Sequence, residues 1–187
     1  ARGANSGIQD ADNLAWKLAF VVRGLADQRL LDTYDAERIA AADENLAAST
    51  RSTDFITPKS AVSRLFRDAV LELAKDHAFA RKLVNSGRLS TPAVLRDSPL
   101  NTPDRDADFP HGDGAMAPGA PAADAPVDGQ RGRWLLRHLE DGFTLLAFGP
   151  VPKQDADALA DGRVPVRVVT VGEGGVADVE GLCATRY

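Results

Sequence analysis

The chain has 187 residues, of which 44% are apolar, and a formal net charge of −5 at pH 7. This size supports one ordinary domain or two small ones, and the acidic balance argues against a nucleic-acid partner. No apolar run reaches the roughly 18 to 20 residues of a membrane span. No signal peptide is visible, and the lone Cys183 excludes an internal disulfide, so a reducing, cytoplasmic location is expected.

The first predicted element is an amphipathic helix that follows a short loop. Ser6 and Gln9 form a capping-box pattern, which places the helix start near Ser6, and Gly24 is expected to end the helix. Its apolar face is defined by residues at helical spacing, Ile8, Ala11, Ala15, Leu18 and Val22. The loop before it, with Arg2 and Gly3, can hold an anionic or electron-rich ligand atom, or it is an ordinary lead-in to a capped helix.

Two further helices are predicted over residues 30–50 and 60–85. The second of these has Ser60 as its cap and is followed by Gly87. Its expected buried stripe consists of Val62, Leu65, Phe66, Ala69, Val70 and Leu73.

Residues 89–128 are predicted to form an irregular connection, because seven of the 11 prolines lie between Pro92 and Pro126. After it, the pattern predicts a helix at 133–142, a strand at 143–149, a helix at 153–162 and a strand at 164–172. The two apolar strands are expected to be neighbours in a parallel sheet with a right-handed crossover. Residues 182–187 suggest the start of another strand, and two strands alone make too small a sheet.

The stretches GANSGIQDADNLAWKLA and LLDTYDAER resemble the third flavin-contacting motif and the following helix of the class A FAD-dependent aromatic monooxygenases. The phenol hydroxylases and the hydroxyphenylpropionate hydroxylases belong to this family. The closing part resembles the thioredoxin-like C-terminal domain of the phenol hydroxylase branch. The implied activity of the parent enzyme is hydroxylation of a phenolic or related aromatic substrate with O₂ and NAD(P)H.

The resemblance implies that the backbone N–H groups of Gly3, Ala4 and Asn5 approach the N1 and O2 edge of the flavin ring. Arg2 would add positive charge beside the same edge, unless its side chain faces solvent. Tyr34, Glu37 and Arg38 match family positions that fix helix packing, although Ile39 and Ala40 depart from the family pattern after them. Asp10 lies inside the predicted helix and is not the family's flavin-contacting Asp.

The implied fold class is α+β. A helical part of an FAD-binding domain is expected at residues 1–88, the connection at 89–128, and a thioredoxin-like domain, truncated at its end, at 129–187. The sequence contains no Gly-x-Gly-x-x-Gly motif for the ADP part of FAD and no Cys-x-x-Cys motif. The chain is therefore expected to be a piece of the enzyme that is inactive by itself and has no dithiol activity.

Other site classes receive little support. His77, His111 and His138 lack the spacing of metal ligands, so no metal site is expected, and Cys183 is interpreted as a small buried thiol. No catalytic residue is assigned. The alternative is a non-catalytic thioredoxin-like module for binding or oligomerisation, and a homodimer is possible in either case.

Overall fold

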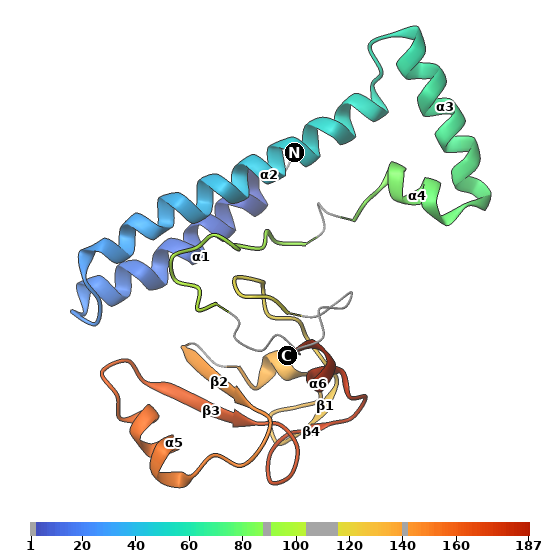
Figure 1. Cartoon of the computed structure of the whole chain (residues 1–187). Coiled ribbons are helices and arrows are strands. Elements are labelled where there is room, and N and C mark those ends of the chain that lie inside the picture. The colour runs from blue at the N-terminus through green and yellow to red at the C-terminus, as the bar shows by residue number, and fades with distance from the viewer. Residues whose placement is uncertain (1–2, 88–90, 104–115, 140–141) are drawn as a thin grey trace. The chain divides into compact units, whose positions relative to one another are not determined.

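A computed structural model of the chain describes residues 3–87, 91–103, 116–139 and 142–187 (Figure 1). The chain forms two compact units. The first consists of residues 1–19 and 28–101, and the second of residues 20–27 and 102–187. Among the described residues, none of the helices is both long and apolar enough to cross a membrane.

Helix α1 spans Gly3–Val22 and begins earlier than predicted. Ser6 is therefore inside the helix and not its cap, and Gly3, Ala4 and Asn5 form the first helical turn where a loop was expected. Gly24 follows the helix with a φ of +69° and donates its N–H to the carbonyl of Val21 at 3.0 Å, so the predicted stop is confirmed.

The face of α1 that the sequence predicted to be buried is exposed in this structure. Ile8 is 70% exposed and Val22 78% exposed, whereas the one fully buried residue among the described part of α1 is Lys17. The physical reason is that α1 meets α2 through polar side chains. Hydrogen bonds and two ion pairs therefore help decide which face of α1 is turned inward.

Helix α2 spans Asp32–Ile56 and follows the 3-10 helix η1, Gln28–Leu31. The single helix predicted at 60–85 is divided into α3, Ala61–Asp76, and α4, Ala78–Val84. The break falls at His77, whose backbone is extended, and Arg81 caps α3 by donating from Nε to the carbonyl of Ala74 at 2.9 Å. Ser60 caps α3 as predicted, because its hydroxyl accepts a hydrogen bond from the Ser63 N–H.

The predicted stripe on α3 is largely exposed. Val70 is buried, but Val62 and Leu65 are 77% and 73% exposed. The buried apolar residues of the first unit are few and mostly small, namely Ala41, Ala48, Val70 and Ala80.

The second unit contains a parallel strand pair, as predicted. Strand β2, Phe143–Ala147, pairs with β3, Val166–Thr170, so that Phe143 lies opposite Val166 and Ala147 opposite Thr170. Helix α5, Lys153–Ala160, makes the connection between them. A second pair, β1 (Val127–Asp128) with β4 (Ala177–Asp178), is antiparallel.

Two predictions for the second unit are wrong. In the segment expected to form a helix at 133–142, the described residues include the 3-10 helix η3, Leu135–Arg137, and no α-helix. The segment expected to begin a strand is helix α6, Leu182–Arg186. The latter packs into the core of the unit, where Cys183 is fully buried. The core consists of Ala125, Val127, Leu135, Val169, Val171, Val176 and Cys183. Ala125 and Val127, in the stretch predicted as connection, thus contribute to a packed core.

Candidate functional site

The first turn of α1 carries the residues that the sequence assigned to cofactor binding. Gly3, Ala4 and Asn5 are exposed, and Arg2 lies outside the described residues. The first N–H groups of an α-helix have no partner inside the helix and carry a partial positive charge. Apart from the chain neighbours of Gly3 and the backbone of its own helix, no described atom lies within 4 Å of where a Cβ on Gly3 would stand. This turn therefore offers accessible donors and open space to an electron-rich group, which fits the ring edge of a flavin.

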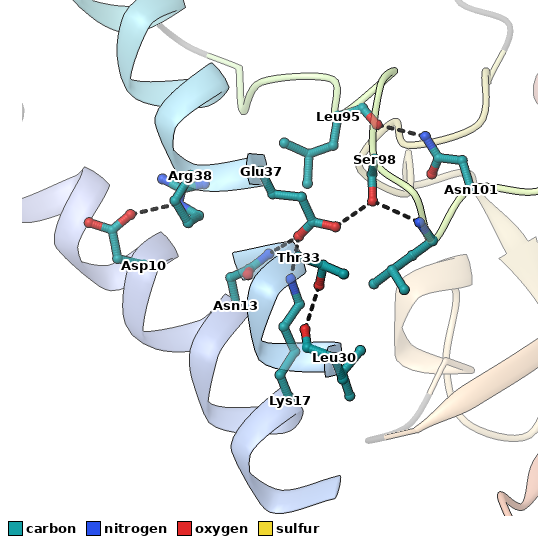
Figure 2. Close-up of polar contacts among 11 residues, drawn as sticks. Asp10, Asn13, Lys17, Leu30, Thr33, Glu37, Arg38, Leu95, Ser98 and Asn101 are labelled. Carbon is teal, nitrogen blue, oxygen red and sulfur yellow. Dashed lines mark hydrogen bonds and ion pairs between the residues drawn. The ribbon is translucent and has the colours of Figure 1, made fainter. Parts of the chain in front are cut away.

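A buried polar cluster lies further along α1, where this helix faces α2 (Figure 2). The Lys17 ammonium donates to Glu37 Oε2 at 2.7 Å, and the Asn13 amide nitrogen donates to the same oxygen at 2.7 Å. Lys17 is 0% exposed and Glu37 6% exposed. Because both charged groups are removed from water, each depends on the other as its partner, and separating them would be costly.

The other oxygen of Glu37 is bonded as well. Glu37 Oε1 accepts a hydrogen bond from the hydroxyl of Ser98, which lies in a turn of the Pro-rich segment (Figure 2). That turn is closed by its own hydrogen bonds. The Leu100 N–H donates to Ser98 Oγ at 3.2 Å, and the Asn101 amide donates to the carbonyl of Leu95 at 2.6 Å. Glu37 thus joins three segments, namely α1, α2 and the turn.

These contacts determine the charge state of Glu37. Burial by itself would raise the pKa of the carboxyl group. Hydrogen bonds from Lys17, Ser98 and Asn13, together with the charge of Lys17, outweigh burial and hold the pKa below its ordinary value of 4.5. Glu37 is therefore ionised at neutral pH.

A second ion pair joins the same two helices nearer the start of α1. Arg38 Nε lies 2.6 Å from Asp10 Oδ1, and the Arg38 side chain is 12% exposed. The structure confirms that Glu37 and Arg38 act in helix packing, and it shows Asp10 within α1, as the sequence indicated.

Sequence reasoning missed Asn13, Lys17 and Ser98. A signal existed for the first two, because Asp10, Asn13 and Lys17 recur at intervals of three and four residues and so define a polar face on the predicted helix. Ser98 had no such signal, since only the fold brings it to Glu37.

In the second unit, the sequence singled out Cys183 and His138, and both side chains are buried. Cys183 is buried, and its burial together with the nearby charge of Asp178 raises the pKa of the thiol to about 11, so it remains protonated. His138 is buried and donates from Nε2 to the Gly132 carbonyl at 2.9 Å. The part of the chain that the structure describes shows no group of three or more side chains able to hold a metal ion, and His111 lies outside it.

Comparison with known proteins shows what the start of the chain is similar to. Residues 1–49 match the family model of an FAD binding domain. A 3-(3-hydroxy-phenyl)propionate/3-hydroxycinnamic acid hydroxylase of Paraburkholderia xenovorans (strain LB400) is 52% identical over 68 residues, which are 36% of this chain and 11% of the relative. The 6-methylpretetramide 4-monooxygenase of Streptomyces rimosus is 50% identical over 62 residues, 33% of this chain and 11% of that enzyme.

Solved structures extend the likeness to the whole chain. Aklavinone-11 hydroxylase, in a ternary complex with FAD and aklavinone, is 26% identical with a TM-score of 0.64 over 100% of this chain and 33% of its own. The rebeccamycin biosynthetic enzyme RebC with reduced flavin is 25% identical with a TM-score of 0.65, over 100% of this chain and 35% of its own. The chain thus spans about a third of these structures, and its match spans about a ninth of the curated relatives.

Together the matches show that the chain is similar to parts of FAD-dependent aromatic hydroxylases. The motifs at its start and the α+β fold agree with this class.

Proposed function

We propose that the chain is part of an FAD-dependent monooxygenase that hydroxylates a phenolic or related aromatic substrate with O₂ and NAD(P)H. The observation that carries this proposal is the match of residues 1–49 to the FAD binding domain family. The matched residues include Gly3, Ala4 and Asn5, which are exposed in the first turn of α1.

When bound, FAD supplies the electrons that activate O₂, after NAD(P)H has reduced it. The residues of this chain bind and orient its ring. The N–H groups of the first turn donate toward the N1 and O2 edge, and the positive end of α1 favours the negative charge that gathers there on reduction. Arg2 is proposed to strengthen the same effect. The buried cluster around Glu37 holds α1 against α2 through Asn13 and Lys17.

The second unit is proposed to be a thioredoxin-like domain without redox activity. The parallel β2–β3 pair with its crossover helix α5 supports this assignment, and the protonated, buried Cys183 favours a structural role. The corresponding division into residues 1–88, 89–128 and 129–187 is part of the proposal.

The test uses the intact FAD-loaded enzyme with 3-(3-hydroxyphenyl)propionate as the probe, under ¹⁸O₂. We expect one ¹⁸O atom in the hydroxylated product and one NAD(P)H oxidised for each product formed. A panel of phenolic probes that stimulates no NAD(P)H oxidation and yields no labelled product would contradict the proposal.

A further inference from the structure

The contact between α1 and α2 includes buried polar side chains. Among the described residues, three polar contacts connect the helices, Asp10 to Arg38 at 2.6 Å, Asn13 to Glu37 at 2.7 Å and Lys17 to Glu37 at 2.7 Å. Apolar contacts are non-directional and tolerate sliding. Hydrogen bonds and buried ion pairs hold only within a narrow range of distance and angle.

Sliding of α1 along α2 would therefore be resisted strongly. A shift by one helical turn is about 5.4 Å, well beyond the reach of a hydrogen bond. It would leave the ammonium of Lys17, which is 0% exposed, without its carboxylate. A buried charge without its partner is among the costliest defects in a protein interior.

Glu37 is also fixed from outside the helix pair. Its Oε1 is bonded to Ser98, whose turn is closed by hydrogen bonds of its own. Both carboxylate oxygens of Glu37 are therefore hydrogen-bonded. If α1 shifted, Glu37 could not move with it without breaking its bond to Ser98. Helix α1 is continuous from Gly3 to Val22, so its first turn, about 15 Å from Asn13, moves with the part that Glu37 holds.

We propose that Glu37 is a positioning residue for the flavin, which locks the axial position of α1 and thereby places the N–H groups of Gly3, Ala4 and Asn5. This inference rests on the proposed function, since it assumes that these groups face the ring edge. A flavin site requires that its hydrogen-bond donors be placed within about 0.5 Å of the productive geometry. The directional contacts of Glu37 restrict the axial position of α1 more closely than non-directional apolar contacts alone.

The first experiment tests the lock itself in the 187-residue chain without flavin. Spin labels on Ile8→Cys and Leu46→Cys, both exposed helix positions, report the distance between α1 and α2. Buried Cys183, with its raised pKa, stays unlabelled. Glu72→Ala, which removes the exposed ion pair with Lys75, is the control and should retain the narrow wild-type distance distribution. Glu37→Ala should broaden the distribution and shift it by up to about 5 Å. An unchanged distribution in Glu37→Ala overturns the proposal.

The second experiment measures the consequence for FAD in the intact enzyme. Glu37→Ala should release FAD on the order of tenfold faster and change the midpoint potential of the flavin, at temperatures where the protein stays folded. Glu37→Asp, which keeps the charge on a shorter side chain, should change both in the same direction by less, and it replaces Glu37→Ala if that variant does not fold. The matched control is Glu72→Ala, which removes the exposed ion pair with Lys75 and should change neither.

The outcomes separate the two claims. A folded Glu37→Ala enzyme with wild-type FAD release and midpoint potential overturns the positioning role. A wild-type enzyme that holds no FAD overturns the proposed function, whatever the spin-label distances show.

Discussion

Lys17 and Glu37 show how a single buried pair can decide which face of a helix is turned inward. The ammonium is removed from water completely, and its partner carboxylate accepts three hydrogen bonds. The motif stretches that carry the family resemblance contain both residues. These two residues of the motif stretches therefore serve the packing of α1 on α2.

Loss of one partner should be costly. Lys17→Met would leave the Glu37 carboxylate buried without its counter-charge, and we expect the free energy of unfolding to fall by about 3–5 kcal/mol. Urea denaturation of the 187-residue chain measures this. The control is Lys75→Met at the exposed pair with Glu72, which should cost less than about 1 kcal/mol. Equal effects of the two substitutions would contradict the buried pairing.

The same carboxylate should make stability depend on pH. Its pKa is lowered in the folded chain relative to the ordinary value of 4.5, so its contribution is fully present above about pH 4.5 and is lost as the pH falls through the folded-state pKa. The wild-type chain should therefore lose stability more steeply than Glu37→Gln between about pH 5 and about pH 3. Parallel curves of unfolding free energy against pH for the two proteins would contradict this assignment.

At the scale of elements, the strands were the most predictable part. Short apolar runs with a helix between them indicated a parallel pair, and β2 and β3 pair in that way. The turned-out face of α1 could not be predicted from periodicity alone, because the apolar stripe and the polar stripe of Asp10, Asn13 and Lys17 both have helical spacing. Burial then depends on which partners the fold supplies. The last helix, α6, was predicted as a strand. The local sequence did not indicate that this segment packs as a helix, because its core contacts come from residues distant in sequence.

The loop between β3 and β4 depends on one glycine. A Cβ on Gly175 would overlap the carbonyl oxygen of Thr170, which accepts the Val176 N–H at 2.8 Å. Gly175→Ala should therefore destabilise the chain by about 1–3 kcal/mol, because the backbone must shift to relieve the overlap. Thermal unfolding measures the loss. The neighbouring Glu173→Ala, at an exposed position, should have little effect, and a Gly175→Ala chain as stable as this control would show that the close approach is absent.

At the scale of the whole molecule, the proposed function has the N-terminal turn donating to the ring edge of FAD. The sequence lacks the glycine fingerprint that binds the pyrophosphate. We therefore expect the 187-residue chain alone to show no tight binding in a fluorescence titration with FAD. Saturable binding with a micromolar or lower dissociation constant would contradict this division of the binding site.

Under the proposed function, the first turn of α1 faces the flavin. The most direct test compares Gly3→Val with Gly7→Val in the intact enzyme. Both glycines are exposed on the same helix, and apart from their chain neighbours and the helix backbone no described atom lies within 4 Å of where a Cβ would stand. Both substitutions should leave the stability of the 187-residue chain within about 0.5 kcal/mol of wild type. FAD retention after gel filtration is the decisive measurement. We expect Gly3→Val to lose FAD and Gly7→Val to keep it. Full FAD retention by Gly3→Val would show that this turn does not contact the flavin.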